Sequence, residues 1–569
     1  MPEPSPGAKP GSINAVIDFD GGIPDGGKPV GIDVATREFL RAFFRFSGQP
    51  AFPTLPPDSL SLATFCDLAA KENIPVERCR SIAGLDDPAL AEAGLLVRYD
   101  PAIAQHAWRR RRHGQRRYSL TGLVHNAATT GAREAIGALA SAPLQSWDAL
   151  ICPSNAIKGA VETVLEGWRY YLADRLGVDR AQALRPSLQL PVIPLGVDTT
   201  RFDKITTPEK RGNQRRALGL GSDATAILYV GRLNYLAKAN PLPLLIAVED
   251  VARRRNPAPV HLLFNGYFND DDNERAFAEA IVAICKFAQV RIVRHGDQDF
   301  PDGLWAAADV FCSPVDNIQE SFGLSPIEAM AAGLPCVVSD WDGYRDTVRN
   351  QVDGFLIPTL APPPGSGVQL AYDHFAGRAH YGDYLSAASQ SSVVDTEALS
   401  RALFTLSANP DLRRDMGASA RRRARETFEW SRIIRDYVAL WTELGERRAR
   451  DAEIGAMGHD TSFHPSHPDP FAMFAGFPTA QIELAGRLEL AGLGWDEAMR
   501  RIRLKISYIY PHTLIALEDL PLLIGQLESV RSTSIVDLAG MLKMDDTAKL
   551  VRTAGWLVKL GICRYRAPE

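Results

Sequence analysis

The sequence predicts two consecutive doubly wound α/β domains followed by a smaller, mainly helical domain. Short apolar runs alternate with longer helical patterns through about residue 440, which is typical of parallel sheets covered by helices. The chain has 569 residues, too many for a single hydrophobic core, so roughly three or four domains are expected. A stretch rich in His, Pro, Asp and Ser at 459–470 separates the helical tail from the rest.

The first α/β domain is expected over residues 12–200, after a lead-in at 1–11 that has no apolar segment and is expected to be disordered. Helical patterns at Asp33–Phe46 and Ala156–Leu176 lie between its strands. The expected strands are Ile13–Asp18, Leu95–Tyr99, Leu120–His125, Ala149–Pro153 and Leu190–Leu195.

The second α/β domain is expected over residues 201–450, joined to the first near Pro194–Pro208. A Pro- and Gly-rich stretch at 361–394 interrupts its pattern and predicts a surface insertion, and an Arg-rich helical pattern over Asp411–Arg450 closes the domain. Residues 451–470 are expected to be a linker and 471–569 a helical domain. The expected strands are Ala226–Val230, Val260–Gly266, Val290–Arg294, Val310–Ser313, Cys336–Ser339 and a short one at Gly354–Ile357.

Composition predicts a cytoplasmic, soluble protein. Hydrophobic content of 46%, charged content of 23% and a formal net charge of −5 are ordinary for globular domains and give no general argument for nucleic-acid binding. Seven scattered cysteines without a Cys-x-x-Cys pair indicate a reducing compartment, with neither a disulfide framework nor a zinc site. No window approaches the 18 or so consecutive apolar residues that a membrane-spanning helix needs.

The most informative segment runs from Glu320 to Pro335 and predicts a tight turn, then a helix that carries Glu328 and ends at Gly333. Ser325 is expected to cap the helix and Pro326 to occupy its first position. A helix N-terminus presents free N–H groups and partial positive charge, so this corner suits an anion such as phosphate. The alternative is structural: Ser325 and Glu328 also fit a capping box, and loop glutamates such as Glu320 are often only solvated.

A second segment places two cations after a buried strand. The strand at 226–230 opens into Gly231, followed by Arg232 and Lys238. Glycine turns at strand ends of open α/β sheets face the ligand crevice, where Arg232 can grip phosphate in a bidentate fork and Lys238 adds a point charge. The alternative is a solvated basic loop.

Together these segments resemble the donor half of retaining glycosyltransferases with the GT-B fold, and among these the large family 4 (group 1). Gly231-Arg232…Lys238 and Glu320-x7-Glu328 carry the resemblance most strongly. Three further segments agree with it: Pro194–Phe202, Asp309–Pro314 (with its last two residues transposed relative to the family pattern) and Arg425–Trp430. The resemblance covers roughly residues 12–445, is specific over 190–345 and is weak in the first 120 residues.

The resemblance implies two Rossmann-like domains facing each other across a cleft and a nucleotide diphosphate sugar as donor. Arg232 and Lys238 would bind the diphosphate, Glu328 the nucleotide ribose, and Glu320 hydroxyls of the transferred sugar. Gly231 and the turn Ser321-Phe322-Gly323-Leu324 would complete the donor site. It also implies retention at the anomeric carbon and no metal or other cofactor, since two cations and a helix N-terminus can neutralise a leaving diphosphate.

In the first domain, His125 ends the expected strand at 120–125, and the resemblance implies that it lies near the donor sugar. A lone histidine at a strand end is otherwise more often structural. The glycine-rich stretch at 20–31 follows the first strand, and the family places a glycine of this loop against the donor phosphates. No standard Gly-Gly spacing fits, so Gly27 and Gly31 are both candidates.

Two charged clusters have structural alternatives. Arg109–Arg112, with Arg116 and Arg117, forms the densest basic cluster, which predicts either a solvated loop or contact with an anionic lipid surface or phosphorylated acceptor. Peripheral contact with the inner face of a membrane would follow from the second reading. Asp270–Asp272 resembles an Asp-x-Asp metal motif but is expected to be an acidic surface loop because of its place in the second series of strands.

The tail contains a helix, tight turn, helix and strand over Ser534–Arg564, which resembles a winged helix. Its second helix offers only Lys549, Arg552 and Lys559 as cations, so a packing, oligomer or protein-partner role is expected rather than DNA binding.

The sequence thus predicts a retaining glycosyltransferase that acts on an acceptor hydroxyl. Two alternatives stay open at this point: another nucleotide-sugar enzyme, such as an epimerase, on the same fold, and a non-catalytic binding or regulatory protein acting through its tail. The acceptor, whether a glycan, a lipid-linked or a small molecule, is not predicted further because acceptor contacts come from the divergent first domain. The nucleotide, the sugar and the linkage formed are not predicted either.

Overall fold

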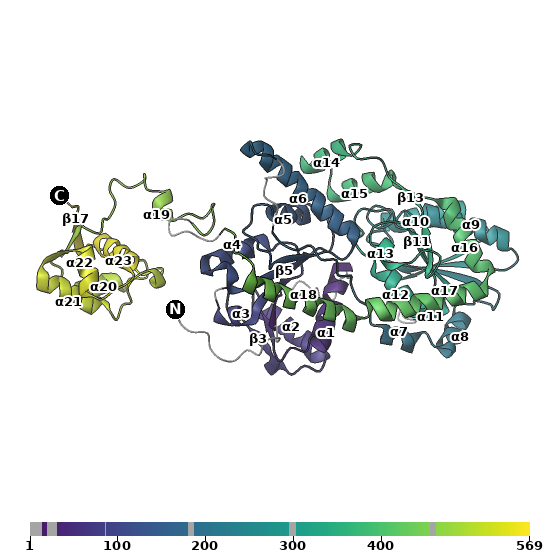
Figure 1. The fold of residues 1–569 in the computed structure, drawn as a ribbon, viewed down its shortest axis with the longest axis horizontal. Coiled ribbons are helices and arrows are strands. Elements are labelled where there is room, and N and C mark those ends of the chain that lie inside the picture. Colours follow the sequence, from purple (N-terminus) through teal and green to yellow (C-terminus); the bar gives the residue numbers. More distant parts are fainter. Residues whose placement is uncertain are drawn as a thin grey trace. The chain divides into compact units, whose positions relative to one another are not determined.

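The computed structural model describes residues 14–19, 31–85, 87–179, 187–294, 303–455 and 462–568. The chain forms two compact units, Met1–His464 and Pro465–Glu569. The first unit contains two six-stranded sheets, each covered by helices on both faces (Figure 1). The predicted fold class, two Rossmann-like α/β domains plus a mainly helical tail, is therefore confirmed.

The first sheet is parallel throughout and has the strand order β3-β2-β1-β4-β5-β6. Its strands are β1 (Asn14–Asp18), β2 (Phe52–Thr54), β3 (Cys79–Ser81), β4 (Gly94–Arg98), β5 (Ser119–Leu123) and β6 (Ala149–Ile151). The helices are α1 (Gly31–Phe46), α2 (Ser59–Lys71), α3 (Pro88–Ala93), α4 (Ala104–His113), α5 (Thr130–Ala138) and α6 (Asn155–Leu176).

The second sheet is also parallel, with the order β12-β11-β10-β7-β8-β9. Its strands are β7 (Thr225–Val230), β8 (Val260–Gly266), β9 (Gln289–Arg294), β10 (Val310–Ser313), β11 (Cys336–Ser339) and β12 (Gly354–Ile357). The helices around it are α7 (Thr199–Ile205), α8 (Pro208–Ala217), α9 (Leu242–Arg255), α10 (Asp271–Ile284), α11 (Gly303–Ala307), α12 (Leu324–Ala332), α13 (Tyr344–Thr347), α16 (Thr396–Ala408) and α17 (Pro410–Arg423).

One face of the first sheet is completed by a helix from the far end of the unit. After a π-helical turn at Ala424–Phe428, α18 (Trp430–Arg450) returns to the first domain and packs on α1 (Figure 1). Trp430, Tyr437 and Trp441 of α18 share a buried core with Phe39 and Phe43 of α1. Large aromatic side chains dominate core energetics, so this face depends strongly on α18.

The two chain crossings between the domains pair with each other. The amide of Val197 donates to the carbonyl of Phe428 (2.8 Å), and the amide of Trp430 donates to the carbonyl of Val197 (3.3 Å). A Cβ at Gly196 would lie 2.4 Å from Cδ2 of Trp430, so only glycine fits between the crossings. The segment that carried part of the family resemblance therefore forms the junction between the two domains.

The predicted insertion leaves the second domain through an antiparallel pair, β13 (Thr359–Leu360) and β14 (Val393–Val394). Between these strands it forms two helices, α14 (Val368–Phe375) and α15 (Tyr381–Gln390). His374 Nε2 lies 3.0 Å from the Thr130 hydroxyl of the first domain. The insertion thus spans the two α/β domains.

The tail has its own buried core and a three-stranded antiparallel sheet of order β16-β15-β17. Its last part runs α22 (Ile535–Met541), α23 (Thr547–Lys559) and β17 (Cys563–Arg566), in the predicted order of helix, turn, helix and strand. The likeness to a winged helix stays a prediction. The remaining elements are α19 (Pro470–Met473), β15 (Arg487–Leu490), α20 (Trp495–Ile502), α21 (Leu520–Val530) and β16 (Ser532–Ser534).

Three details of the first sheet differ from the prediction. Leu190–Leu195 forms no strand, and only an isolated bridge joins Val192 to Cys152. Conversely, β2 and β3 were not predicted, because each has three residues and three residues are too few to show a period. Proline at 191 and 194 reduces the hydrogen bonds that the 190–195 segment can donate to a neighbouring strand.

Candidate functional site

A cavity of about 520 Å³ lies between the two α/β domains, at the carboxyl ends of strands β5, β7 and β8. Ligands of open α/β sheets bind at this edge, where the loops leave the strands. Nearly all predicted site residues line the cavity: His125, Gly231, Arg232, Lys238, Glu320, Ser321, Phe322, Gly323, Leu324 and Glu328. Gly27 lies outside the described residues, and Gly31 is the first residue of α1, three residues before the lining residue Val34.

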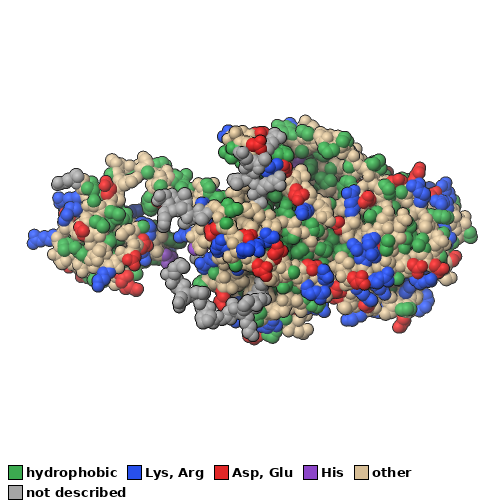
Figure 2. Space-filling model, in the orientation of Figure 1, with side chains coloured by type: hydrophobic (Ala, Val, Ile, Leu, Met, Phe, Trp, Pro, Cys, Tyr) green, Lys and Arg blue, Asp and Glu red, His purple; other side chains and the backbone are tan. Residues whose placement is uncertain are grey.

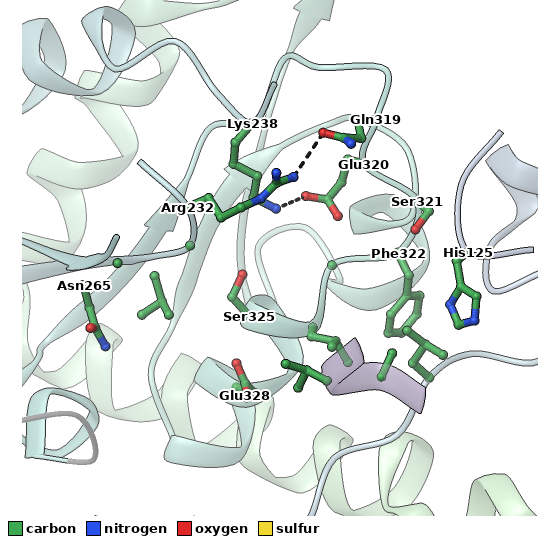
Figure 3. A pocket seen from close by; sticks show the side chains of 18 of the residues that line it. His125, Arg232, Lys238, Asn265, Gln319, Glu320, Ser321, Phe322, Ser325 and Glu328 are labelled. Carbon is green, nitrogen blue, oxygen red and sulfur yellow. Dashed lines mark hydrogen bonds and ion pairs between the residues drawn. The ribbon is translucent and has the colours of Figure 1, made fainter. Parts of the chain in front are cut away.

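The cation-bearing loop leaves β7 where two backbones meet closely. A Cβ at Gly266, the last residue of β8, would lie 2.0 Å from the carbonyl oxygen of Gly231. Glycine at 266 therefore lets the neighbouring strand ends approach and brings the loop that starts at Gly231 over the cavity. Arg232 and Lys238 reach the cavity from this loop (Figure 3).

The two cations contact the loop that precedes α12. Lys238 Nζ donates to Glu320 Oε2 in an ion pair that is largely buried. Arg232 Nη2 donates to Gln319 Oε1 at 3.1 Å (Figure 3). An ammonium group has three donors and a guanidinium five, so both cations can bind phosphate oxygens while keeping these contacts.

Buried polar residues fix the distance between the two loops. Asn317 Nδ2 donates to the Leu236 carbonyl (3.0 Å), and the Asn240 amide donates to Asp316 Oδ1 (3.3 Å). On the other side, Trp341 Nε1 donates to the Asn317 carbonyl (3.1 Å). Burial raises the pKa of Asp316 to about 7. These hydrogen bonds join the loop after β7 to the loop before α12, and so hold Arg232, Lys238 and Glu320 in place.

Helix α12 begins earlier than predicted. Its first residue is Leu324, with Gly323 at the N-cap and no side-chain cap hydrogen bond, so Ser325 is not the cap and Pro326 is not the first helical residue. The capping box between Ser325 and Glu328 consequently does not form, and Glu328 lies in the second turn, facing the cavity (Figure 3). Glycine occupies the N-cap because the backbone there has φ = +87°, a conformation that serine rarely adopts.

Tyr344 supports Glu320 from behind. Its hydroxyl lies 3.0 Å from the Ser313 hydroxyl and 3.5 Å from Glu320 Oε2, and its side chain is fully buried. The ring packs against Gly323, where a Cβ would lie only 2.1 Å from Tyr344 Cε1. The Glu320 carboxylate is therefore contacted both by the Lys238 ammonium group and by the Tyr344 hydroxyl.

His125 follows β5 and contributes an imidazole from the first domain (Figure 3). Its Nε2 is buried and has no hydrogen-bond partner among the described residues. Burial lowers the pKa of His125 to about 4, although a hydrogen bond to the Tyr99 backbone and the Asp100 charge act in the opposite direction. The imidazole is therefore neutral at pH 7.

We expect His125 to make the protein less stable as the pH falls from about 6.5 towards 4. The pKa of about 4 in the folded chain is lower than the usual value of about 6.5 for an unfolded one, so in this window only the unfolded state takes up the proton. The measurement is the free energy of urea unfolding of wild type and His125→Gln at pH 7 and pH 5. Between pH 7 and pH 5, the free energy of unfolding should fall more for wild type than for His125→Gln. An equal fall in both proteins would contradict the lowered pKa of His125.

Several lining residues escaped the sequence analysis: Asn126, Arg201, Asn265, Tyr267, Trp305 and Gln319. Gln319 directly precedes Glu320, and this position next to a predicted site residue could have identified it. Asn265 and Tyr267 flank the glycine at the end of β8, a position where strand-end residues face the crevice. Arg201 and Trp305 come from helices α7 and α11, and nothing in their local sequence indicates a cavity.

The arginine cluster is largely tied into the first unit. Arg110 is fully buried and donates two bonds to Asp148, at 2.6 and 2.7 Å, so it is not part of a solvated loop. Arg111 donates to the Gly455 carbonyl at 3.0 Å, and Arg116 donates to the carbonyls of Arg448 and Asp451. Figure 2 shows charges of both signs interspersed over the visible face of the α/β domains. Peripheral membrane contact through 109–117 stays a prediction.

Within the described part of the chain, no group of three or more His, Cys, Asp or Glu side chains could hold a metal ion. Asp270 is the N-cap of α10 and accepts from the Asn273 amide (2.8 Å), while Asp271 and Asp272 lie exposed in its first turn. The seven cysteines are free. The described helices include none that is both long and apolar enough to cross a membrane.

Fold and site together define a two-domain α/β protein whose cleft combines two cations, two carboxylates and a helix N-terminus. Comparison with known proteins finds a family match: a model described as "Glycosyl transferases group 1" matches residues 224–363. The D-inositol 3-phosphate glycosyltransferase of Geodermatophilus obscurus is 27% identical over 405 residues, covering 68% of this chain and 76% of that protein. An uncharacterized glycosyltransferase of Methanocaldococcus jannaschii is 28% identical over 174 residues, 30% of this chain and 42% of its own length.

Among solved structures, the Anabaena protein HepE in complex with UDP aligns with 76% of this chain and 100% of its own, at 16% identity and a TM-score of 0.48. The family match confirms the predicted resemblance to group 1 glycosyltransferases, and the two facing sheets are those of the GT-B fold. The family match and the curated relative support a glycosyltransferase.

Proposed function

We propose that the protein transfers a glycosyl unit from a nucleotide diphosphate sugar to an acceptor hydroxyl, with retention at the anomeric carbon and without a metal ion. The observation that carries the proposal is the arrangement around the cavity. Arg232 and Lys238 lie on one loop, and Glu320 and Glu328 lie on either side of the α12 N-terminus. A molecule with two phosphates and several hydroxyls matches this set of partners.

In this proposal the diphosphate lies between the cation-bearing loop and the N-terminus of α12. As the bond to the sugar breaks, negative charge builds up on the leaving diphosphate. Arg232, Lys238 and the free N–H groups of the helix are already in place to stabilise it, which is the main contribution such a site makes to the rate. This work is the kind that a bound metal ion would otherwise do, so the proposal needs none.

Glu328 would accept hydrogen bonds from the ribose, and Glu320 from hydroxyls of the transferred sugar. The Lys238–Glu320 ion pair then joins the two ends of the donor, because one group faces phosphate and the other faces sugar. His125 would lie near the sugar, where its neutral imidazole can exchange hydrogen bonds without adding charge. Retention is taken from the family resemblance.

Calorimetric titration with UDP, GDP and ADP tests the donor half of the proposal. We expect saturable binding of one nucleotide to wild type, weakened about tenfold, or about 1.4 kcal/mol, in Arg232→Ala and in Glu328→Ala. Arg275→Ala is the matched control, since Arg275 is exposed on α10, away from the cavity lining, and pairs with nearby Asp272. No binding of any of the three nucleotides to wild type would overturn the proposal.

A further inference from the structure

The N-terminus of α6, in the first domain, contacts the loop that carries Glu320 in the second. Ser154 is the N-cap of α6 and is fully buried. Its hydroxyl accepts from the Ile157 amide (3.2 Å) and donates to the Ser321 carbonyl (2.7 Å), one residue after Glu320. One hydroxyl therefore both caps a helix of one domain and holds the donor loop of the other.

The next residue of α6 makes a second contact across the cleft. The backbone amide of Asn155 donates to Asp346 Oδ2 (2.7 Å), and its side-chain Nδ2 donates to Asp346 Oδ1 (3.0 Å). Asp346 belongs to α13, and its carbonyl accepts from Arg423 Nη2 (2.9 Å), so its backbone is tied to α17. Both oxygens of the Asp346 carboxylate thus accept hydrogen bonds from the first residue of α6. The helix dipole and the free N–H groups at this end of the helix favour a negative charge.

The segment around α13 also presses on the donor loop from the other side. A Cβ at Gly343 would lie 2.5 Å from Phe322 Cα and 2.9 Å from the Ser321 carbonyl oxygen. The following residue, Tyr344, reaches Glu320 through its hydroxyl. The Ser321 peptide is therefore enclosed by Gly343 of its own domain and Ser154 of the other.

Asp342 lies between these contacts. Its Oδ1 is 3.4 Å from the Ser154 hydroxyl, and its backbone has φ = +46°, unusual for a residue other than glycine. Burial, with the nearby Glu320 charge, raises the pKa of Asp342 to about 8. A neutral carboxyl at pH 7 adds no repulsion to Glu320, which lets the segment pack this closely against the loop.

We propose that Ser154 and Asn155 are positioning residues that set the geometry of Glu320 when the two domains meet. We call Ser154, Asn155, Ser321 and Asp346 the interdomain clasp. The proposal rests on the proposed function, because it takes Glu320 to be the residue that orients the donor sugar. Ser154 holds the Ser321 carbonyl, whereas the proposed nucleotide contacts are Arg232 and Glu328, so the clasp acts on turnover more than on nucleotide affinity.

Three substitutions at Ser154 separate the clasp from the cap. Ser154→Thr keeps a hydroxyl that can cap α6 and donate to Ser321. Ser154→Asp keeps a cap acceptor but has no proton to donate as a carboxylate, and Ser154→Ala loses both functions. Thr163→Ala is the matched control, because the Thr163 hydroxyl is on the same helix and donates to the Gly159 carbonyl of that helix at 2.8 Å.

Two readouts are compared: hydrogen–deuterium exchange of the 318–323 amides, and turnover of the sugar conjugate of whichever nucleotide binds. For Ser154→Asp and Ser154→Ala we expect faster exchange and a kcat about tenfold or more lower, with nucleotide Kd within about twofold of wild type. Ser154→Thr and Thr163→Ala should match wild type.

If Ser154→Asp matches wild type in both exchange and kcat, Ser154 is only a helix cap and the proposal is wrong. The hydrogen–deuterium exchange comparison needs no substrate, so it tests by itself whether Ser154 holds the 318–323 segment. Absence of nucleotide binding and turnover in wild type would instead overturn the proposed function, which keeps the two failures distinguishable.

Discussion

Replacing Lys238 by alanine is expected to reduce the rate of nucleotide release from the donor by about 10²–10³-fold, the usual effect of removing one group that stabilises a leaving anion. Lys238 is the cation that contacts Glu320, so its loss removes charge stabilisation at the diphosphate and also frees the sugar-side carboxylate. The measurement is steady-state turnover of the nucleotide sugar that wild type accepts. Lys286→Ala is the control, since Lys286 is exposed and bonds only the Val282 carbonyl.

A paired substitution separates the chemical effect of Lys238 from its effect on stability. Lys238→Ala leaves a largely buried carboxylate without its partner and should lower the free energy of unfolding by about 1–3 kcal/mol. Adding Glu320→Gln removes the unpaired charge and should restore most of that stability but none of the activity. Recovery of turnover in the double variant would contradict the proposed role of both residues.

Gly323→Ala is expected to destabilise the protein strongly. The residue has φ = +87°, and the added Cβ would lie 2.1 Å from Cε1 of the buried Tyr344 ring, which cannot move aside. Backbone strain and overpacking together predict a loss of about 2–4 kcal/mol. Displacing Tyr344 also moves its hydroxyl away from Glu320, so activity should fall with stability.

Gly177→Ala provides the comparison for this prediction. Gly177 ends α6 with φ = +66°, but a Cβ there meets nothing within 4 Å. Its substitution should lower the free energy of unfolding by about 1 kcal/mol, the effect of the unfavourable φ angle alone. Equal losses in urea unfolding for the two variants would show that the contact with Tyr344 is not what requires glycine at 323.

The second domain could be predicted closely from sequence because each signal there is local. Strands β8, β10, β11 and β12 occupy the predicted ranges, since each is an apolar run bounded by turn residues. Most of the predicted site residues also line the cavity, because the chain places them in loops after strands or at the start of a helix, whereas Arg201 and Trp305 have no such signal. Their roles as donor ligands remain predictions that the experiments above test.

What the sequence could not predict depends on contacts between distant residues. The start of α12 was misplaced because the Ser-Pro-Ile-Glu sequence favours a cap at Ser325, whereas packing of Gly323 on Tyr344 selects a different start. Arg110 was expected either in a solvated loop or at an anionic surface, yet it is buried because Asp148, thirty-eight residues away, accepts two hydrogen bonds from its guanidinium. The contacts of Ser154 with the second domain likewise have no local signal.

The dependence of the first sheet on α18 has a consequence for how the chain is made. The core shared by Phe39, Phe43, Tyr437 and Trp441 joins residues almost four hundred positions apart. Because domains generally fold as units from the N-terminus during synthesis, the first domain leaves the ribosome long before the helix that covers this face. Until α18 arrives, several large aromatic side chains stay uncovered, a state that favours aggregation. Fragments that end before Trp430 should therefore be poorly soluble, and the first α/β domain is not a self-sufficient expression unit.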